Sequence, residues 1–215
     1  MPHHRICWWL GCLEAAGVAA KMGGVVVYPT DTVYGIGSSP WSEVGTEAVF
    51  RVKRRPPSKP VPLLLDDVET AGFIGEMGED AWRLARRFWP GALTIIVPLR
   101  DTSIHPLVTG GGRCVGLRVP AHPAPRHLAR LAGGAIIGTS ANISGMPPKR
   151  SLEDVLLELG AEPIDYFLDG GVLGGAPSTV VNLCATPPRI ERVGALDPRV
   201  IRDVLGAELV VEHRG

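Results

Sequence analysis

The sequence predicts a single α/β domain. Short apolar runs of strand length alternate with segments of helical periodicity along all 215 residues. No repeat, low-complexity tract or shift in composition marks a second domain. Some of the expected strands follow one another without a helix between them, which indicates a mixed rather than a purely parallel sheet.

The expected elements cover most of the chain. The expected strands are Val25–Tyr28, Val61–Leu65, Ala92–Pro98, Arg113–Val119, Ala135–Gly138, Asp165–Leu168, Ser178–Leu183 and Arg189–Val193. The expected helices are Leu13–Met22, Glu43–Arg54, Val68–Ile74, Asp80–Trp89, Pro125–Leu131, Ser151–Leu159 and Pro198–Leu205.

Three helix ends carry local signals. Ser151 and Asp154 have the spacing of a capping box. Asp197 precedes a proline at the expected first helical position, where a missing N–H costs nothing. The pair Pro90-Gly91 ends the helix that contains Trp82 and Trp89.

Composition is that of a globular protein with a substantial core. Hydrophobic residues make up 45% of the chain, and 22 basic residues balance 22 acidic ones. A neutral chain argues against a broad basic face for duplex nucleic acid, although it allows a local basic pocket. No apolar run has the length of a membrane span, so we expect an unprocessed cytoplasmic protein without membrane contact.

The four cysteines are expected to be free thiols. Cys7, Cys12, Cys114 and Cys184 form no CxxC pair and complete no zinc-ligand set. A reducing compartment favours free thiols, so a Cys7–Cys12 disulfide is not expected.

The stretch from Tyr28 to Gly37 reads YPTDTVYGIG and directly follows an apolar strand. A proline and glycines bound a turn that presents two threonines, an aspartate and two tyrosines. Such a concentration of hydroxyl groups on a stiff turn indicates a binding wall, whereas simple packing explains Tyr28 better than Tyr34.

A second signal is the cationic stretch from Arg51 to Pro60, RVKRRPPSKP. Its cations could complement a helix C-terminus, which would account for Lys53 or Arg54. A proline-locked loop that continues to Lys59 also suits phosphates, because fixed charges need little reorganisation. On charge alone, a helix C-terminus and a phosphate-binding loop explain these cations equally well.

A third signal lies on the strand around Arg118. Alternation places Val115, Leu117 and Val119 on one face and Gly116 and Arg118 on the other. The guanidinium of Arg118 could hold a carboxylate or phosphate in a bidentate manner. Taken alone, an arginine on the solvated face of an edge strand is the preferred interpretation.

Two loops complete the candidate groups. GTSANISG follows the strand at Ala135 and offers Ser140 and Asn142 to a ligand, although a turn that uses these side chains on its own backbone is favoured for an isolated motif. The glycine-rich segment that runs from Gly170 to Ser178 is not a P-loop, because no Gly-Lys-Ser/Thr ends it.

Nothing in the sequence has the pattern of a covalent nucleophile. GxSxG, HExxH and GxGxxG are absent, and His122, between Ala121 and Pro123, is better explained as structural. Cations, hydroxyls and amides suit the positioning of charged substrates, as in transfer at phosphorus.

The order of the motifs along the chain is similar to that of a known protein family. The chain contains YPTDTVYGIG, KRRPPSKP, FWPGALTIIV, VGLRVPAHP, GTSANISG and STVVNL, in that order. In this order and spacing the motifs resemble the YrdC-like family of threonylcarbamoyl-adenylate synthases, from about Leu13 to Leu205. The resemblance implies one YrdC-like domain, a twisted mixed sheet with helices around a deep positively charged cavity, and not a Rossmann fold. It implies a catalytic domain over residues 13–206, with an N-terminal extension at 1–12 and a tail at 207–215.

The resemblance also implies an activity. L-Threonine, bicarbonate or CO2, and ATP would give threonylcarbamoyl-AMP and pyrophosphate, which makes the enzyme a nucleotidyltransferase. Partner proteins would then modify tRNAs that read ANN codons. Mg²⁺ would accompany ATP, and no protein metal cage or enzyme nucleophile is implied.

Site residues carry over from the family motifs position by position. Thr32, Arg118 and Ser178 are expected to bind threonine. Lys53, Arg55, Lys59, Ser140, Asn142 and Arg192 are expected to bind ATP. One departure is Leu64, where some members have a histidine that contacts threonine, so one such contact is in doubt here.

Two other functions stay open at this stage. An RNA-binding or ribosome-maturation module would use the concave basic site and bind RNA with a steep salt dependence. A carbamoyl-transfer relative would use carbamoyl phosphate, although the acylphosphatase and zinc-finger segments of such proteins are missing here.

Overall fold

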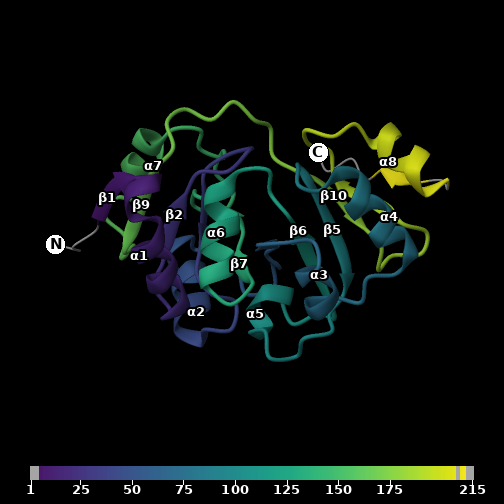
Figure 1. Cartoon of the computed structure of the whole chain (residues 1–215), viewed down its shortest axis with the longest axis horizontal. Coiled ribbons are helices and arrows are strands. Elements are labelled where there is room, and N and C mark those ends of the chain that lie inside the picture. Colours follow the sequence, from purple (N-terminus) through teal and green to yellow (C-terminus); the bar gives the residue numbers. More distant parts are fainter. Residues whose placement is uncertain (1–4, 207–208, 212–215) are drawn as a thin grey trace.

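Two mixed β-sheets and the helices packed on them form the computed structural model, which describes residues 5–206 and 209–211 (Figure 1). The helices are α1 (Trp9–Lys21), α2 (Glu43–Val52), α3 (Thr70–Ile74), α4 (Glu79–Phe88), α5 (Pro106–Thr109), α6 (Pro123–Leu131), α7 (Leu152–Leu159) and α8 (Pro198–Leu205). Among the helices of these residues, none is long and apolar enough to cross a lipid bilayer. The predicted mixed α/β class is confirmed, with two sheets where one was expected.

The first sheet lies at the N-terminal end of the molecule and has five strands (Figure 1). In spatial order they are β1 (Arg5–Trp8), β9 (Tyr166–Asp169), β2 (Val26–Tyr28), β3 (Gly35–Gly37) and β8 (Thr139–Ser140). β9 pairs in parallel with both β1 and β2, whereas β3 is antiparallel to β2 and to β8.

The second sheet has seven strands and reaches the opposite end of the molecule. In spatial order they are β12 (Val210–Val211), β11 (Arg189–Arg192), β10 (Thr179–Asn182), β5 (Leu93–Pro98), β6 (Cys114–Arg118), β4 (Leu63–Leu65) and β7 (Ala135–Ile137). β6 is an inner strand, antiparallel to β5 and parallel to β4.

The two sheets meet where the chain passes from β7 to β8 through Gly138. The N–H of Gly138 donates to the carbonyl of Pro62 (2.8 Å), and that of Ile137 donates to Ser38 (3.0 Å). A Cβ on Gly37 would lie 2.0 Å from the carbonyl oxygen of Ile137. Only glycine therefore permits β3 to approach β7 this closely.

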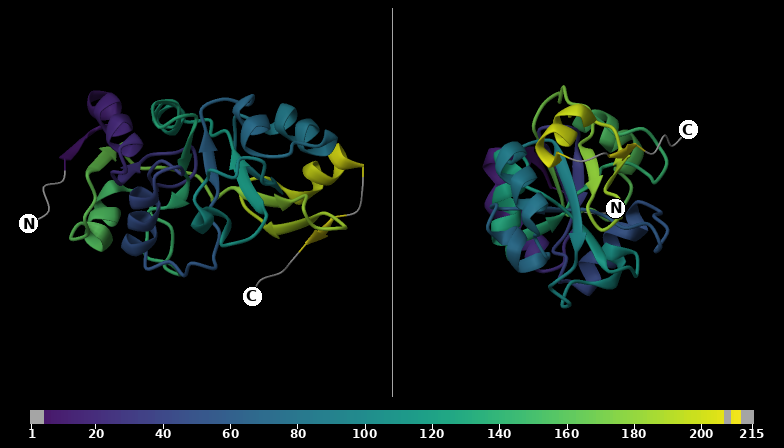
Figure 2. Two further views of the ribbon diagram at one scale, coloured as in Figure 1. Left: turned by 90° about the horizontal axis from the view of Figure 1, so that it is seen from below. Right: turned by 90° about the vertical axis from the view of Figure 1, so that its right-hand side faces the viewer.

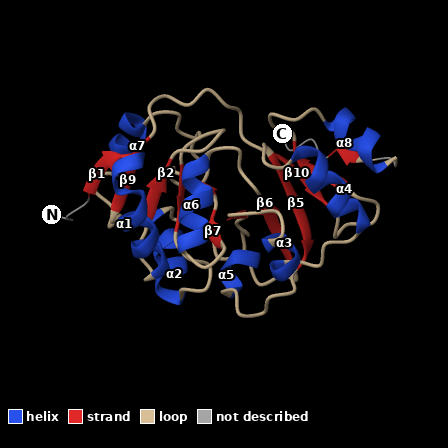
Figure 3. Cartoon of the chain, in the orientation of Figure 1, coloured by secondary structure: helices blue, strands red, loops and turns tan. Residues whose placement is uncertain are grey.

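Strand alternation divides the core between two apolar clusters. On the strand that includes β2, Val25 and Val27 face the larger cluster, whereas Val26 and Tyr28 face the smaller one. Helices α1 and α6 pack side by side over the smaller cluster (Figures 2 and 3). The turn that follows Tyr28 is therefore anchored by packing on both faces of its strand.

The predicted helix ends are confirmed. The hydroxyl of Ser151 accepts the N–H of Asp154 (3.1 Å), as the capping box requires. Asp197 accepts the N–H of Arg199 (2.9 Å) at the start of α8. Helix α4 ends at Phe88, just before Pro90-Gly91.

Strands near both ends of the described chain pair with strands of the two sheets. Residues 5–12, expected as an extension, form β1 and the first turn of α1, and β1 pairs with β9. β12, within the expected tail, pairs with β11. Residues 207–208 and 212–215 of that tail lie outside the described residues.

The expectation of free thiols is wrong for this structure. Disulfides join Cys7 to Cys12 and Cys114 to Cys184. β1 and the first turn of α1 bring the first pair of Cα atoms to 6.3 Å. The second pair, 6.7 Å apart, lies on β6 and beyond the end of β10, the two strands that flank β5. A spacing of 70 residues gives no sequence signal for such a pairing.

Candidate active site

A cavity of about 160 Å³ lies where the two sheets meet. The turn after β2 contributes Thr32 and Tyr34 to its wall, and strands β4, β5 and β6 contribute Leu64, Thr94 and Arg118. Ser140, Ser178, Arg55 and Arg192 also line the cavity. Six of the nine predicted site residues therefore line one cavity, although they come from segments far apart in the sequence.

Arg118 is held firmly at the base of this cavity. Its Nη2 donates to Asp31 Oδ1 (2.6 Å), its Nε to the carbonyl of Gly91 (2.8 Å) and its Nη1 to Thr32 Oγ1 (3.3 Å). Its side chain is only 6% exposed. The interpretation preferred from the residues alone, a solvated arginine on an edge strand, is wrong because β6 has a partner on both sides.

The turn that contains Thr32 is stiff because Thr30 organises it. The Thr30 hydroxyl accepts the N–H groups of Thr32 (3.0 Å) and Val33 (3.2 Å) and donates to the Val33 carbonyl (2.6 Å). These hydrogen bonds explain why the Thr32 side chain, although it lies on a turn, has a fixed direction. The sequence pointed to the turn, but not to Thr30 as the residue that holds it.

The two tyrosines of the turn have different roles. Tyr34 lines the cavity; its hydroxyl donates to the Gly171 carbonyl (2.8 Å) and accepts the Gly170 N–H (2.9 Å). Burial is the main cause that raises the pKa of Tyr34 to about 12, so it stays a neutral hydroxyl at pH 7. Tyr28 packs in the smaller apolar cluster and donates to the Ile137 carbonyl (2.6 Å).

Ser178 joins two strands of the second sheet at the cavity wall. Its hydroxyl lies 2.9 Å from Thr94 Oγ1 and accepts from Arg192 Nη2 (3.0 Å), while its carbonyl accepts from Arg192 Nε (3.0 Å). Burial, and then the nearby charge of Arg118, lowers the pKa of Arg192. Thr94 was missed in the sequence, where its only signal is a hydroxyl within an otherwise apolar strand.

A larger cavity of about 1140 Å³ adjoins the first. Arg55, Pro62, Thr94 and Arg192 line both, so the two cavities share a wall, and Lys59 lines the larger one. Arg55 is fixed by the loop it belongs to, since its Nε donates to the Lys59 carbonyl (3.1 Å) and its Nη2 to the Pro60 carbonyl (2.7 Å). The cationic loop therefore faces a cavity and does not serve only as a helix end.

Lys53 and Asn142 lie behind the cavities and line neither. Lys53 is 1% exposed and its Nζ donates to the backbone carbonyls of Ser140 and Asn142. The amide nitrogen of Asn142 donates to the carbonyls of Ile143 (2.8 Å) and Met146 (2.7 Å), while its Oδ1 is buried without a hydrogen-bond partner among the described residues. In this structure both side chains shape the loop that places Ser140.

The buried position of Lys53 gives a pH-dependent prediction. Burial, and then the charge of Arg55, lowers the pKa of Lys53 to about 7, while Glu158 opposes the shift. Between pH 7 and the ordinary lysine pKa, the unfolded chain binds more protons than the folded one, so stability rises with pH. We expect wild type to gain stability over Lys53→Met from pH 7 to 10, by up to about 1.4 kcal/mol per pH unit.

Urea unfolding at several pH values checks this prediction. Lys21→Met, which removes an exposed lysine, is the control for loss of one cation. A constant difference between wild type and Lys53→Met across the range would contradict the assignment of a depressed lysine pKa.

The glycine-rich loop passes close over the Thr32 turn. A Cβ on Gly175 would lie 2.6 Å from the Cα of Thr32, and one on Gly170 would lie 2.4 Å from Pro29 Cβ. Pro177, at the end of the loop, lines the smaller cavity. These glycines therefore permit close backbone approach.

The smaller cavity is strongly cationic. Three guanidinium groups line it, and none of the described residues that line it has a carboxylate. The carboxylate of Asp31 touches Arg118 from outside the lining. A small, partly buried and cationic cavity of this kind suits a small carboxylate ligand, and the adjoining larger cavity has room for a nucleotide.

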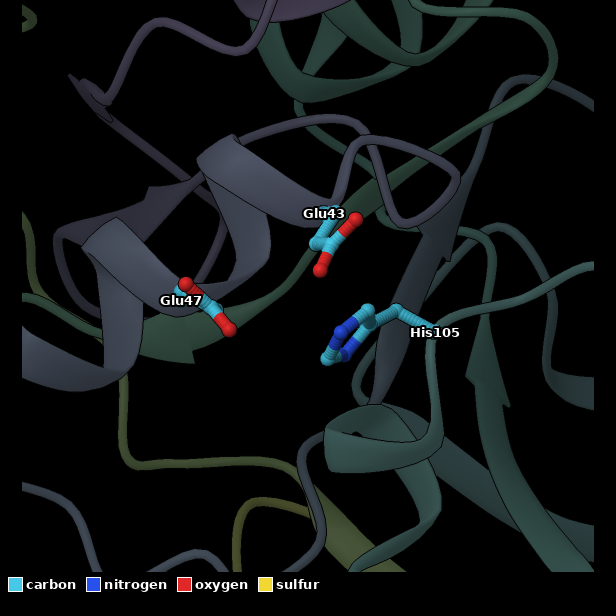
Figure 4. Close-up of side chains that lie close together, drawn as sticks. All are labelled: Glu43, Glu47 and His105. Carbon is cyan, nitrogen blue, oxygen red and sulfur yellow. The ribbon is translucent and has the colours of Figure 1, made fainter.

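A separate cluster lies at the start of α2, away from both cavities. Glu43, Glu47 and His105 point toward one another, with potential ligand atoms within 4.8 Å of each other (Figure 4). However, the Nδ1 of His105 accepts the N–H of Leu107 (3.3 Å). The proton of the neutral ring therefore lies on Nε2, which favours a hydrogen bond to a carboxylate over metal ligation.

Comparison with protein families gives a match over residues 18–194 to the Sua5_yciO_yrdC model, described as telomere recombination. The chain belongs to the Sua5/YciO/YrdC family. It is 35% identical over 196 residues to a threonylcarbamoyl-AMP synthase of Bacillus subtilis, which covers 90% of this chain and 56% of that protein. It is 37% identical over 199 residues to a putative threonylcarbamoyl-AMP synthase of Mycobacterium tuberculosis, with 92% and 90% covered.

Among solved structures, Pyrococcus abyssi Sua5 complexed with L-threonine superposes with a TM-score of 0.87 at 34% identity. The match covers 93% of this chain and 58% of that one. The chain thus spans a little over half the length of the B. subtilis and P. abyssi members of the family.

Proposed function

We propose that this chain joins L-threonine, bicarbonate or CO2, and ATP to give threonylcarbamoyl-AMP and pyrophosphate. The observation that carries the proposal is the pair of adjoining cavities, one small with a fixed arginine and one large with a cationic loop. The names of two relatives and the threonine complex of a third support it.

In this proposal threonine occupies the smaller cavity. Its carboxylate pairs with Arg118, and the hydroxyls of Thr32 and Ser178 position the rest of the molecule. The three guanidinium groups of the wall disfavour a further positive charge there. They therefore lower the pKa of threonine's ammonium group and favour the free amine that must attack carbon dioxide.

ATP occupies the larger cavity, with its phosphates toward the wall that the two cavities share. Arg55 and Lys59 bind the phosphates, and Arg192, which lines both cavities, faces the reacting phosphorus. Ser140 lines the smaller cavity and not the larger one, and Lys53 and Asn142 act by holding its loop, so the expected contacts of these three residues to ATP stay predictions. Leu64 supplies an apolar wall to the smaller cavity.

The chemistry needs no enzyme nucleophile. The amine attacks carbon dioxide to form a carbamate, whose oxygen then attacks the α-phosphate as pyrophosphate leaves. Both steps depend on oriented reactants and stabilised negative charge, so the enzyme is a nucleotidyltransferase that works by proximity and electrostatics.

Mg²⁺ enters with ATP as part of the substrate in this proposal. Glu191 is the one carboxylate among the described residues that line the two cavities, and it accepts a hydrogen bond from Asn182. A phosphate-bound ion with retained water fits such a site better than an all-protein cage.

We also propose that partner proteins transfer the threonylcarbamoyl group to tRNA in the cytoplasm. A role as an RNA-binding module is not favoured. Four of the candidate cations, Arg55, Lys59, Arg118 and Arg192, line the two cavities, whereas an RNA-binding module needs cations that follow the nucleic-acid backbone.

An assay with purified protein tests the proposal. ATP, labelled bicarbonate and threonine should release pyrophosphate and give a labelled adenylate, and omission of any one reactant should abolish both. ATP turnover without threonine dependence, or carbamoyl phosphate as the better substrate, would contradict it.

A further inference from the structure

Asp31 makes the shortest contact to Arg118 although it lines neither cavity. Its Oδ1 lies 2.6 Å from Nη2, compared with 2.8 Å for the Gly91 carbonyl and 3.3 Å for the Thr32 hydroxyl. We infer that Asp31 is a positioning residue that makes Arg118 select a monoanionic carboxylate over a phosphate. The inference rests on the proposed function, because it takes Arg118 as the group that binds threonine's carboxylate.

Asp31 first affects the orientation of the Arg118 guanidinium. A guanidinium group has five N–H donors in one plane, and three of the N–H groups of Arg118 are bound to protein, which leaves two for a ligand. A carboxylate is also planar, so its bidentate pairing depends on the angle at which those two donors are presented. Asp31 forms the only ion pair among these three anchoring contacts and therefore contributes most to fixing that angle.

Asp31 also affects the charge of the smaller cavity. Arg55, Arg118 and Arg192 line the same small cavity, and the charge of Arg118 helps to lower the pKa of Arg192, so these groups affect each other. A phosphate or pyrophosphate has more charge than a carboxylate and gains more from an additional positive charge. By neutralising one of three cations, Asp31 weakens the attraction of this cavity for polyanions that belong in the larger one.

Among the described groups near Asp31, Arg118 is the cation that balances its charge. His122 is near enough for Asp31 to favour the charged form of its ring, but burial has the larger effect and lowers the pKa of His122. Its Nδ1 accepts the N–H of Ala124 (3.1 Å) at the start of α6. A neutral His122 does not compensate Asp31, so the carboxylate acts on Arg118.

Because of these two effects, we expect Asp31 variants to bind threonine more weakly and pyrophosphate more strongly. In Asp31→Ala we expect the Kd for threonine to rise at least tenfold, because the anchor is lost. We expect inorganic pyrophosphate to compete with threonine several-fold more strongly, because the cavity is more cationic. Asp31→Asn, which keeps an acceptor but loses the charge, should show the gain in pyrophosphate competition with a smaller loss of threonine binding.

Isothermal titration with threonine, alone and with inorganic pyrophosphate, measures both changes. Asp80→Asn is the matched control, because it removes the carboxylate of an exposed Asp–Arg pair on α4 and should change neither affinity. A merely structural role of Asp31 would weaken both ligands together. That result, or no change in either affinity, overturns the inference.

A second measurement separates this inference from the proposed function. If the wild-type protein binds no threonine, the proposed function fails, but the Arg118 Nε–H signal in NMR still reports on positioning. Slow hydrogen exchange in wild type and fast exchange in Asp31→Ala supports the role of Asp31. Equal exchange rates in both proteins contradict it.

Discussion

Arg118→Ala is expected to weaken threonine binding by roughly 10- to 150-fold and to leave ATP binding nearly unchanged. Removal of a charge-assisted contact costs about 1.5–3 kcal/mol. Arg118 lines the smaller cavity and not the larger one, so its loss should act on the amino acid alone. Its removal also leaves the Asp31 carboxylate without its partner, which further disfavours an anionic ligand.

Titration of the variant with threonine and with ATP tests this expectation. Arg100→Ala is a suitable control, because Arg100 is exposed and donates to the carbonyl of Gly72, away from both cavities. A fall in ATP affinity with threonine affinity intact would show that Arg118 serves the phosphates instead.

Gly37→Ala is expected to destabilise the fold by about 3 kcal/mol and to impair threonine binding as well. The added Cβ would lie 2.0 Å from the oxygen and 2.9 Å from the carbon of the Ile137 carbonyl. These are backbone atoms, so no side-chain rotation relieves the clash and β3 must move away from β7. The same junction places Gly138 and Ser140 in the cavity wall, so binding should fall with stability.

Urea unfolding compares this variant with Gly78→Ala. Gly78 lies before α4 with φ of −66°, and a Cβ there would have no neighbour within 4 Å. Gly78 is the N-cap residue of α4, where alanine is less favourable than glycine, so we expect the control to lose about 1 kcal/mol at most. Equal stability of Gly37→Ala and wild type would mean that the two sheets do not meet as described.

The sequence was sufficient for the longer elements because their burial is periodic. Val115, Leu117 and Val119 are buried and alternate with the less buried Cys114 and Gly116, although Arg118 is buried as well, and the capping box at Ser151 forms. The short strands β3 and β8 were missed, because their sequences, Gly-Ile-Gly and Thr-Ser, contain no apolar run. They exist because β3 pairs with both β2 and β8.

For the candidate site, the sequence indicated which residues are chemically suitable but not which way they point. Ser140 lines the cavity, whereas Asn142, two residues further on, turns back to its own loop. Lys53 and Arg55 belong to one motif, but Lys53 is buried against carbonyls and Arg55 faces both cavities. These directions depend on contacts across the sheet junction, which no local pattern records.

The contact between Asp31 and Arg118 could not be predicted from the sequence either. Its place in the turn identified it as part of the motif, but its partner Arg118 lies 87 residues away. Only the meeting of the two sheets brings the two charges together. The Cys114–Cys184 pair was missed for a related reason. Its two cysteines come close only because the second sheet places β6 and β10 on either side of β5.

A crystal structure with threonine and a non-hydrolysable ATP analogue tests the central claim most directly. We predict that threonine's carboxylate lies on Arg118 beside Thr32, with the phosphates in the larger cavity next to Arg55 and Lys59. Phosphate on Arg118, or threonine bound away from the junction of the sheets, would contradict the account.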